Sequence, residues 1–338
     1  MKLHRLEAIR GVAAIYVALE HAVPSRPLIL SFGQEAVMMF FLLSGFVIEY
    51  SSAHLIHKGF LQYFLKRFLR IYPILICLII AVILSGTVSI SSWDSWKSIL
   101  GHLMMLQDFE TAKPNVIVPT TFSSALWSLH YEWWFYMLYF PVSKYFKKDI
   151  QVSAIGITGL ISAIIYLIYP NPISRLLLYF PIWWTGVILC RLYVQYQTIK
   201  FEMLKRPITY LASIAMILSI PCIQIIVQGN SFKLGIHPFL EFRHLIGSLL
   251  VIVIAITWQN FKWIGFSRML NWGCYVAPIS YSFYISHEPL FTNASYLNGL
   301  LNPIIEKVVY LIVLLGFCLF SELWVYPRVR NLSWQFMK

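Results

Sequence analysis

Residues 6–23 read LEAIRGVAAIYVALEHAV, a stretch apolar enough to enter a lipid bilayer that nevertheless carries four ionisable side chains. These side chains are Glu7, Arg10, Glu20 and His21. An ionisable side chain inside a membrane usually faces a partner or a water-filled cavity, because it is costly in lipid. The stretch therefore predicts a membrane helix with a polar face, along which a functional site lies.

The composition of the whole chain agrees with a membrane environment. Of its 338 residues, 59% are hydrophobic and 12% are charged, whereas about a quarter of the residues in soluble domains are charged. Aromatic residues make up 17% of the chain, as expected where Trp and Tyr lie at bilayer interfaces. The five cysteines stand singly, mostly in apolar runs, and so indicate neither disulfides nor a metal site.

Apolar runs of about 20 residues are long enough to cross a bilayer as helices, which satisfy their own backbone hydrogen bonds in lipid. The sequence predicts an all-α, polytopic membrane helix bundle with about ten such helices. No soluble domain is evident, so residues 1–338 are interpreted as a single transmembrane domain without an appended extracytoplasmic domain. The expected spans are 7–27, 34–54, 73–90, 124–145, 151–169, 174–194, 207–228, 243–259, 277–297 and 304–325.

The distribution of the basic residues predicts how these spans are oriented across the membrane. If the N-terminus is cytoplasmic, 19 Lys and Arg residues fall on the cytoplasmic side and 7 on the other side. Basic loops stay in the cytoplasm, so both termini are predicted to be cytoplasmic. The same rule explains the net charge of +12 without a nucleic-acid partner. Arg10 interrupts the apolar part of a signal-like N-terminus, so cleavage is not expected.

Arg10 and His21 are expected to share one helix face. Eleven residues of an α-helix turn through about 1,100°, which is about 20° past three full turns, and rise about 16 Å. A cation near the cytoplasmic edge suits an anionic ligand, and a deeper imidazole suits work as a general base or nucleophile. The simpler alternative is that Arg10 extends to the membrane surface while His21 packs between helices. The alignment of the two favours a polar path with a reaction centre along it.

With this R-x10-H spacing, the stretch resembles the first helix of the acyltransferase-3 family of membrane acyltransferases, although Glu7 and Ala8 depart from its more usual residues. R-x10-H alone occurs often by chance, but further elements of the family pattern are spread over nearly the whole chain. They are MFFLLSGFVI (39–48), KRFLRIYP (66–73), LWSLHYEWWFYMLYFP (126–141) and ISYSFYISHEPLF (279–291), with a looser match at SELWVYP (321–327).

The resemblance implies which residues bind the acyl donor, acyl-CoA, whose phosphates suit guanidinium groups. They are Arg10, Arg67, Arg70 and Tyr72. Composition gives a second interpretation of the segment around Arg67, in which basic and aromatic side chains anchor an interfacial helix to anionic lipids. The two roles are compatible. No metal and no permanently bound cofactor is expected.

His21 is the first candidate for catalysis and Glu132 the second. Counted along their helices, Glu132 and His287 each lie about 12–15 Å deep, so one central cluster with His21 is geometrically possible. If Glu132 meets His21, its carboxylate would fix the imidazole tautomer. Otherwise Glu132 forms a structural ion pair, or contacts the acceptor hydroxyl while His287 orients it. The residues assigned to acceptor binding are His287, Trp127, Tyr136 and Tyr284.

Two motif residues also have a simple structural interpretation. Trp127 fits an aromatic belt at the outer membrane interface. Ser44, beside Gly45, is expected to let two helices approach closely, because it lacks the strand-to-helix turn that exposes a nucleophilic serine.

The resemblance implies a membrane O-acyltransferase, in particular an O-acetyltransferase, that moves an acyl group from cytoplasmic acyl-CoA to a hydroxyl of an extracytoplasmic or lipid-linked glycan. It leaves open the acceptor, the acyl chain, an acyl-histidine intermediate and the oligomeric state. The implied location is the plasma (inner) membrane of a bacterium, with lipids as the surrounding partner. The alternative is a transporter or flippase of a lipid-linked saccharide or small acid, which would not consume acyl-CoA. Paired broken helices, frequent in transporters, are not evident in the sequence, and this favours the enzyme.

Overall fold

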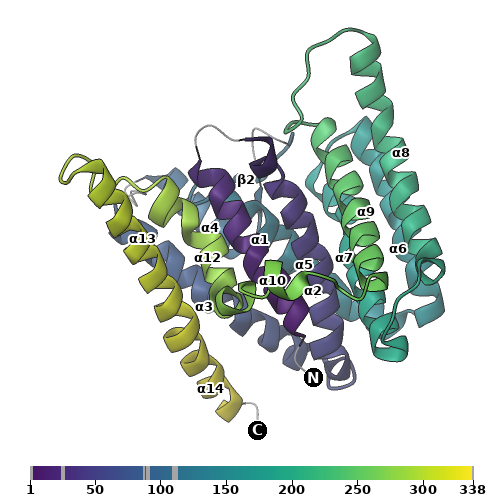
Figure 1. Cartoon of the computed structure of the whole chain (residues 1–338), viewed down its shortest axis with the longest axis horizontal. Helices are drawn as coiled ribbons and strands as arrows, with labels where there is room; N and C mark the ends of the chain where they lie inside the picture. Colours follow the sequence, from purple (N-terminus) through teal and green to yellow (C-terminus); the bar gives the residue numbers. More distant parts are fainter. Residues whose placement is uncertain (1–2, 24–26, 87, 89–91, 109–112, 337–338) are drawn as a thin grey trace.

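The computed structural model describes residues 3–23, 27–86, 88, 92–108 and 113–336, and within them the chain is helical almost throughout (Figure 1). The ends of two predicted spans, 24–26 and 87, 89 and 90, lie outside the described residues. The first half contains α1 (His4–Ala22), η1 (Leu28–Leu30), α2 (Gly33–Ser52), η2 (Ala53–Leu55), α3 (Phe60–Leu84), α4 (Trp93–Leu103), the paired strands β1 (Gln107–Asp108) and β2 (Val118–Pro119), η3 (Ser124–Leu126), α5 (Trp127–Tyr145) and α6 (Lys148–Ile168). The second half contains α7 (Pro172–Tyr196), η4 (Phe201–Leu204), α8 (Lys205–Val227), α9 (Phe239–Asn260), α10 (Phe266–Met269), α11 (Gly273–Val276), η5 (Ala277–Ile279), α12 (Ser280–His287), η6 (Glu288–Thr292), α13 (Pro303–Leu319), η7 (Phe320–Val325) and α14 (Tyr326–Phe336).

The prediction of an all-helical membrane protein is confirmed. Within the described part of the chain, seven helical segments are long and apolar enough to cross a bilayer: Gly33–Leu55, Phe60–Leu84, Lys148–Ile168, Pro172–Tyr196, Phe201–Val227, Phe239–Asn260 and Pro303–Asn331. The other three predicted spans, 7–27, 124–145 and 277–297, overlap α1, α5 and the broken segment η5–α12–η6, which ends at Thr292. These elements carry more polar side chains, and the total of ten spans stays a prediction.

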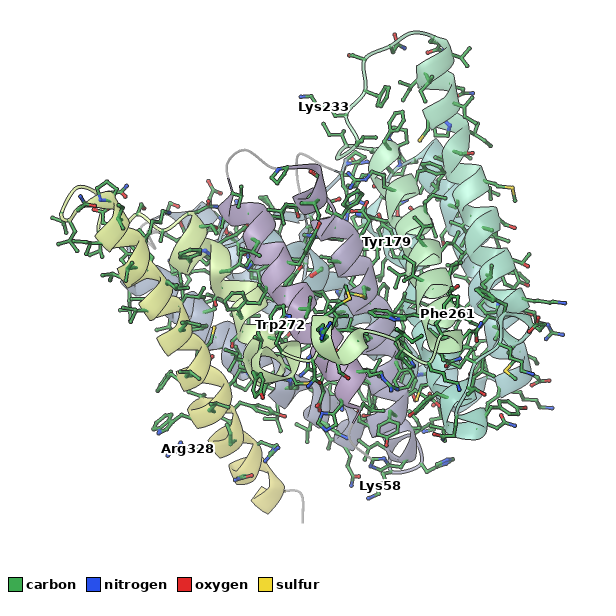
Figure 2. All side chains as sticks on the ribbon, in the orientation of Figure 1. Lys58, Tyr179, Lys233, Phe261, Trp272 and Arg328 are labelled. Atoms are coloured by element: carbon green, nitrogen blue, oxygen red, sulfur yellow. The ribbon has the colours of Figure 1, made fainter. Side chains whose placement is uncertain are left out.

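The two ends of the bundle are distinguished by their basic residues. α1 begins and α14 ends at the same end, the lower edge of Figure 1. Lys58 and Arg328 also lie at this end, whereas Lys233 lies at the opposite end (Figure 2). The predicted topology requires this separation, because it places Lys58 and Arg328 on the cytoplasmic side and Lys233 on the other side. Which end is cytoplasmic stays a prediction.

Glycines set the closest helix contacts. A Cβ atom added to Gly45 of α2 would lie 2.0 Å from the Trp183 carbonyl oxygen of α7, and one added to Gly186 of α7 would lie 2.0 Å from the Leu42 carbonyl oxygen of α2. Small residues let helix backbones approach in this way. The close approach expected at the S-G pair is therefore found at its glycine.

Two helices near the C-terminus are widened by π-helical turns. η6 continues α12 and begins with Glu288, and η7 continues α13 and contains Glu322. π-helical turns inside helices are frequent at functional sites, since the extra residue redirects a side chain. Both carboxylates are buried, and each contacts a basic residue of another helix.

Candidate active site

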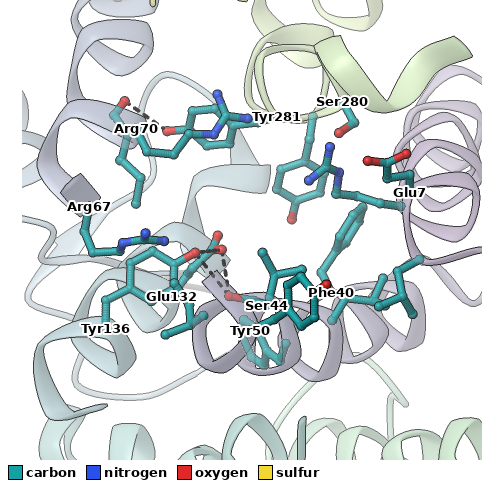
Figure 3. A pocket seen from close by; sticks show the side chains of 18 of the residues that line it. Glu7, Phe40, Ser44, Tyr50, Arg67, Arg70, Glu132, Tyr136, Ser280 and Tyr281 are labelled. Atoms are coloured by element: carbon teal, nitrogen blue, oxygen red, sulfur yellow. Dashed lines mark hydrogen bonds between the residues drawn. The ribbon is translucent and has the colours of Figure 1, made fainter. Parts of the chain in front are cut away.

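A cavity of about 470 Å³ opens among α1, α2, α3, α5 and α12 (Figure 3). We call it the basic cavity, because four cationic side chains and two carboxylates line it. The cations are Arg10, Lys66, Arg67 and Arg70, and the carboxylates are Glu7 and Glu132. Its other polar lining residues are Ser44, Tyr50, Ser128, Tyr136, Ser280, Tyr281, Tyr284 and Tyr326.

Arg10 and Arg67 present unused hydrogen-bond donors. The Nη2 atom of Arg10 donates to the Ala277 carbonyl at 2.8 Å, and Nη2 of Arg67 donates to Ser52 Oγ at 2.8 Å. In both residues the Nε atom is buried and makes no hydrogen bond. Both residues line the basic cavity, so their guanidinium groups are suited to an anionic ligand that enters it.

Arg70 is already paired. It donates to Glu322 of η7 through Nη1 at 2.6 Å and through Nη2 at 3.2 Å. The rings of Tyr281 and Tyr326 lie 5.3 and 4.9 Å from its guanidinium carbon. This two-pronged contact fixes the Arg70 side chain at the cavity wall and links α3 to η7.

Glu132 lies in the basic cavity, within a network of its own (Figure 3). Its Oε1 atom accepts hydrogen bonds from Ser44 Oγ, at 3.0 Å, and from the Tyr136 hydroxyl. Ser44 in turn accepts a hydrogen bond from Trp183 Nε1 at 3.1 Å. Ser44 therefore orients a cavity carboxylate as well as occupying a helix contact, and the carboxylate that meets His21 is not Glu132.

The carboxylate that meets His21 is Glu288. Nδ1 of His21 lies 2.5 Å from Oε1 of Glu288, whose side chain also accepts hydrogen bonds from Ser123 Oγ at 3.1 Å and from the backbone N–H and hydroxyl of Ser124. Glu288 is buried, whereas the side chain of His21 is 25% exposed. The contact therefore leaves one edge of the imidazole accessible.

His287 completes this group, which we call the histidine cluster (His21, His287 and Glu288). Its ring lies 5.2 Å from the ring of His21, measured between centroids. Nδ1 of His287 lies 2.7 Å from the Tyr284 carbonyl oxygen, and because a carbonyl only accepts, Nδ1 carries the proton. Nε2 of His287 is therefore an acceptor, and it is buried without a hydrogen-bond partner.

The histidine cluster has the residue types of a zinc site. Its potential ligand atoms lie within 4.8 Å of one another, and no other group of three His, Cys, Asp or Glu side chains is so close in the described part of the chain. However, two ligands of one tetrahedral zinc ion, with bonds of about 2.0–2.1 Å, lie about 3.3 Å apart. The 2.5 Å between His21 and Glu288 instead fits a charge-assisted hydrogen bond.

Tyr284 and Ser128 connect the two regions. Both line the basic cavity, and their hydroxyl oxygens are 2.9 Å apart. The ring of Tyr284 lies 6.2 Å from the ring of His287. Tyr284 thus lines the basic cavity and also lies beside the histidine cluster.

The structure divides the predicted site residues into three groups. Tyr72 and Trp127 form the first group and lie away from the site. The Tyr72 hydroxyl donates to the Leu103 carbonyl at 2.7 Å. Trp127 stacks on His244, and its ring centroid lies 3.9 Å from Lys113 Nζ. His21 and His287 form the histidine cluster. The remaining six, which line the basic cavity, are Arg10, Arg67, Arg70, Glu132, Tyr136 and Tyr284.

The motif comparison passed over Glu288, the third residue of the histidine cluster. It directly follows His287 in ISYSFYISHEPLF, at a position that the family pattern leaves open between the histidine and Pro289. The available signal was that Glu288 is the sole acidic residue of the predicted span 277–297, where a carboxylate requires a partner.

A second buried charge cluster joins Asp108 and Lys113, in the connection between α4 and α5, to Arg175 of α7. Asp108 accepts from Lys113 at 3.4 Å, from Arg175 at 2.9 Å and from the Tyr131 hydroxyl at 2.7 Å. Burial disfavours the Asp108 carboxylate, but Lys113 and Arg175 outweigh it and hold the pKa of Asp108 below its ordinary value. Burial lowers the pKa of Lys113 to about 8, although Asp108 opposes that shift. This cluster fastens the connection to α5 and α7.

A family model described as "Acyltransferase domain" matches residues 3–323, nearly the whole chain. The chain matches no curated protein and no solved structure.

Proposed function

The chain belongs to the acyltransferase-3 family, and on that premise we propose that this membrane acyltransferase is an O-acetyltransferase that takes its acyl group from cytoplasmic acetyl-CoA. The proposed acceptor is a hydroxyl group of an extracytoplasmic or lipid-linked glycan, and the proposed location is the plasma membrane of a bacterium. The acetyl group, the glycan and the bacterial membrane follow from what the sequence resembles.

The observation that carries the donor assignment is the set of guanidinium side chains that line the basic cavity, those of Arg10, Arg67 and Arg70. Arg10 and Arg67 each keep a buried Nε–H without a partner. Guanidinium groups bind phosphate oxygens with two parallel hydrogen bonds, and the phosphates of coenzyme A supply such oxygens. Lys66 adds a further cation to the lining of the cavity, although its Nζ also donates to the Ser51 carbonyl. The donor would enter from the end of the bundle where α1 begins.

The proposed chemical step uses His21 as general base. Nε2 of His21 takes the proton of the acceptor hydroxyl as that oxygen attacks the thioester carbonyl carbon. The carbon–sulfur bond then breaks, and the proton passes from His21 to the departing thiolate. The products are the acyl ester and free coenzyme A. Direct attack by His21, giving an acyl-histidine, is the variant of this step in which the imidazole acts as nucleophile.

The arrangement of the two regions supports transfer between two sides. Arg10 lies in the first half of α1 and His21 at its last turn, so the donor phosphates and the reacting centre are separated along the helix. Tyr284 and Ser128 lie between them at the cavity wall. Glu132 is proposed to act at the donor end, where its carboxylate faces the basic cavity, and His287 and Tyr284 to bind the acceptor. Trp127 and Tyr72, which lie elsewhere, are not assigned a contact with either substrate.

The test is thiol release from acetyl-CoA by the purified protein in nanodiscs, with and without glycan acceptors. We expect wild type to release thiol, His21→Ala to abolish release, and Arg10→Ala mainly to raise the donor KM. Two exposed residues give matched controls, His57→Ala and Arg268→Ala, which should match wild type. If wild type neither releases thiol nor binds acetyl-CoA saturably, the donor assignment is wrong. If His21→Ala retains release, the assignment of the base is wrong.

A further inference from the structure

We propose that Glu288 is the positioning residue of the reaction, which holds His21 in the tautomer that exposes an unprotonated Nε2 to the acceptor hydroxyl. The proposal rests on the proposed function, because it assigns a role to Glu288 only if His21 is the base. It also assigns the two buried carboxylates to different tasks, with Glu288 at the imidazole and Glu132 in the basic cavity.

The contact itself determines the tautomer. A carboxylate only accepts hydrogen bonds, so the 2.5 Å contact requires His21 to carry its proton on Nδ1. The lone pair is then on Nε2, at the other edge of the ring. When Nε2 takes a proton, the nearby carboxylate stabilises the imidazolium that forms. This is the function that a third residue performs in catalytic triads.

The carboxylate of Glu288 is held in place by contacts that do not involve His21. Its Oε2 atom accepts from Ser123 Oγ and from the backbone N–H of Ser124, and its Oε1 atom accepts from Ser124 Oγ. The side chain is buried at the first residue of the π-helical turn η6. A backbone N–H cannot reverse its role, so this network accepts only an oxygen at the Oε2 position. Residues at η3 and η6 therefore set the orientation of the carboxylate, and the carboxylate in turn orients the imidazole of His21 on α1.

This asymmetry makes Glu288→Gln an informative substitution. The amide oxygen must occupy the Oε2 position, where Ser124 N–H donates, and the amide nitrogen then replaces Oε1. That nitrogen donates toward Nδ1 of His21 and forces the proton onto Nε2. The variant therefore keeps the shape of the side chain while it removes the lone pair that would accept the substrate proton.

The experiment measures donor turnover and donor binding for wild type, Glu288→Gln and Glu288→Asp in nanodiscs. We expect Glu288→Gln to lower kcat by about two to four orders of magnitude, the range covered by general-base catalysis and by loss of the correct tautomer. The donor KM and the Kd for acetyl-CoA should stay at the wild-type values, because Glu288 does not line the basic cavity. Glu288→Asp retains an acceptor-only group and should give an intermediate kcat.

A matched control separates positioning from a general loss of stability. Glu35→Gln also removes a carboxylate from an ion pair, with Arg243 at 2.7 Å, and Glu35 belongs neither to the lining of the basic cavity nor to the histidine cluster. It should lower the thermal unfolding temperature and leave kcat unchanged. The tautomer is read directly from the ¹⁵N chemical shifts of labelled histidine, with His21 assigned by the loss of its signals in His21→Ala. Protonated Nδ1 in wild type and protonated Nε2 in Glu288→Gln are expected.

Each result decides the proposal. A folded Glu288→Gln with wild-type kcat overturns it, and so does a His21 that carries its proton on Nε2 in wild type. Loss of turnover on treatment with 1,10-phenanthroline, restored by Zn²⁺, also overturns it, since the histidine cluster would then hold a metal. Failure of wild type to turn over or bind acetyl-CoA instead refutes the proposed function, and the ¹⁵N measurement still tests the tautomer.

Discussion

The guanidinium of Arg70 is held by Glu322 through two hydrogen bonds, of 2.6 and 3.2 Å, at the wall of the basic cavity. The carboxylate comes from a π-helical turn near the C-terminus, whereas the arginine belongs to the third helix. Glu322 therefore both orients Arg70 and neutralises part of its charge before an anionic donor binds.

Glu322→Gln should lower the donor KM. The amide oxygen can still accept a hydrogen bond from Arg70, but it no longer competes electrostatically with the donor phosphates. We expect a decrease of about fivefold, which corresponds to ~1 kcal/mol. Arg70→Gln should raise the donor KM instead. The measurement is thiol release over a range of acetyl-CoA concentrations.

The control for this substitution is Glu49→Gln, which removes the partner of Arg191 outside the cavity. Its donor KM should equal that of wild type. If Glu322→Gln raised the KM as much as Arg70→Gln does, orientation of Arg70 would matter more than its neutralisation, and the prediction would fail.

Gly45→Ala should strongly destabilise the protein. The added Cβ atom would lie 2.0 Å from the Trp183 carbonyl oxygen, a backbone atom that cannot rotate away, so α2 and α7 must separate. Overpacking of this kind costs about 1–3 kcal/mol or more. Gly316→Ala is the matched control, because nothing lies within 4 Å of its added Cβ and alanine is the better helix former. Thermal unfolding in nanodiscs compares the two, and equal unfolding temperatures would contradict the packing argument.

Most of the fold follows from local sequence, since length and apolarity decide whether a segment can cross a bilayer. The span predicted at 277–297 was less accurate. It is divided among η5, α12 and the π-helical turn η6, and Pro289 lies inside that turn. A hydropathy pattern gives the extent of an apolar run, but it does not reveal where the helical hydrogen bonds shift by one residue.

Helical periodicity also predicts which side chains of one helix line the site together. Ser128, Glu132 and Tyr136 follow one another at four-residue spacing, so they share a face, and all three line the basic cavity. Trp127 stands about 100° away from that face, and Tyr72 stands about 200° from Arg70, which explains why the motif residues Trp127 and Tyr72 point elsewhere. The contact of His21 with Glu288 could not be derived in this way, because it depends on how α1 packs against η6.

The stability of the protein should increase between pH 8 and pH 10 through Lys113. Its pKa is lowered to about 8 in the folded state from 10.5, so between these values the folded state binds fewer protons than the unfolded state. The free energy of unfolding therefore rises with pH in this window, by up to about 1.4 kcal/mol per pH unit. Lys113→Met removes the titrating group and should lack this rise. Thermal unfolding of both proteins from pH 7 to pH 10 gives the difference, and parallel pH profiles would refute the prediction.

Tyr136→Phe and Tyr72→Phe should differ in kcat/KM for acetyl-CoA, although each variant loses one hydroxyl from a motif tyrosine. The Tyr136 hydroxyl donates to Glu132 inside the basic cavity, and its loss leaves that carboxylate with Ser44 as its donor among the described contacts. A hydrogen bond to a charged group contributes about 1.5–3 kcal/mol, so we expect kcat/KM for acetyl-CoA to fall by about tenfold or more. The Tyr72 hydroxyl donates to the Leu103 carbonyl outside the cavity, so Tyr72→Phe should lower the unfolding temperature slightly and leave kcat/KM unchanged. A loss of kcat/KM in Tyr72→Phe equal to that in Tyr136→Phe would show that the donor extends beyond the basic cavity toward α4.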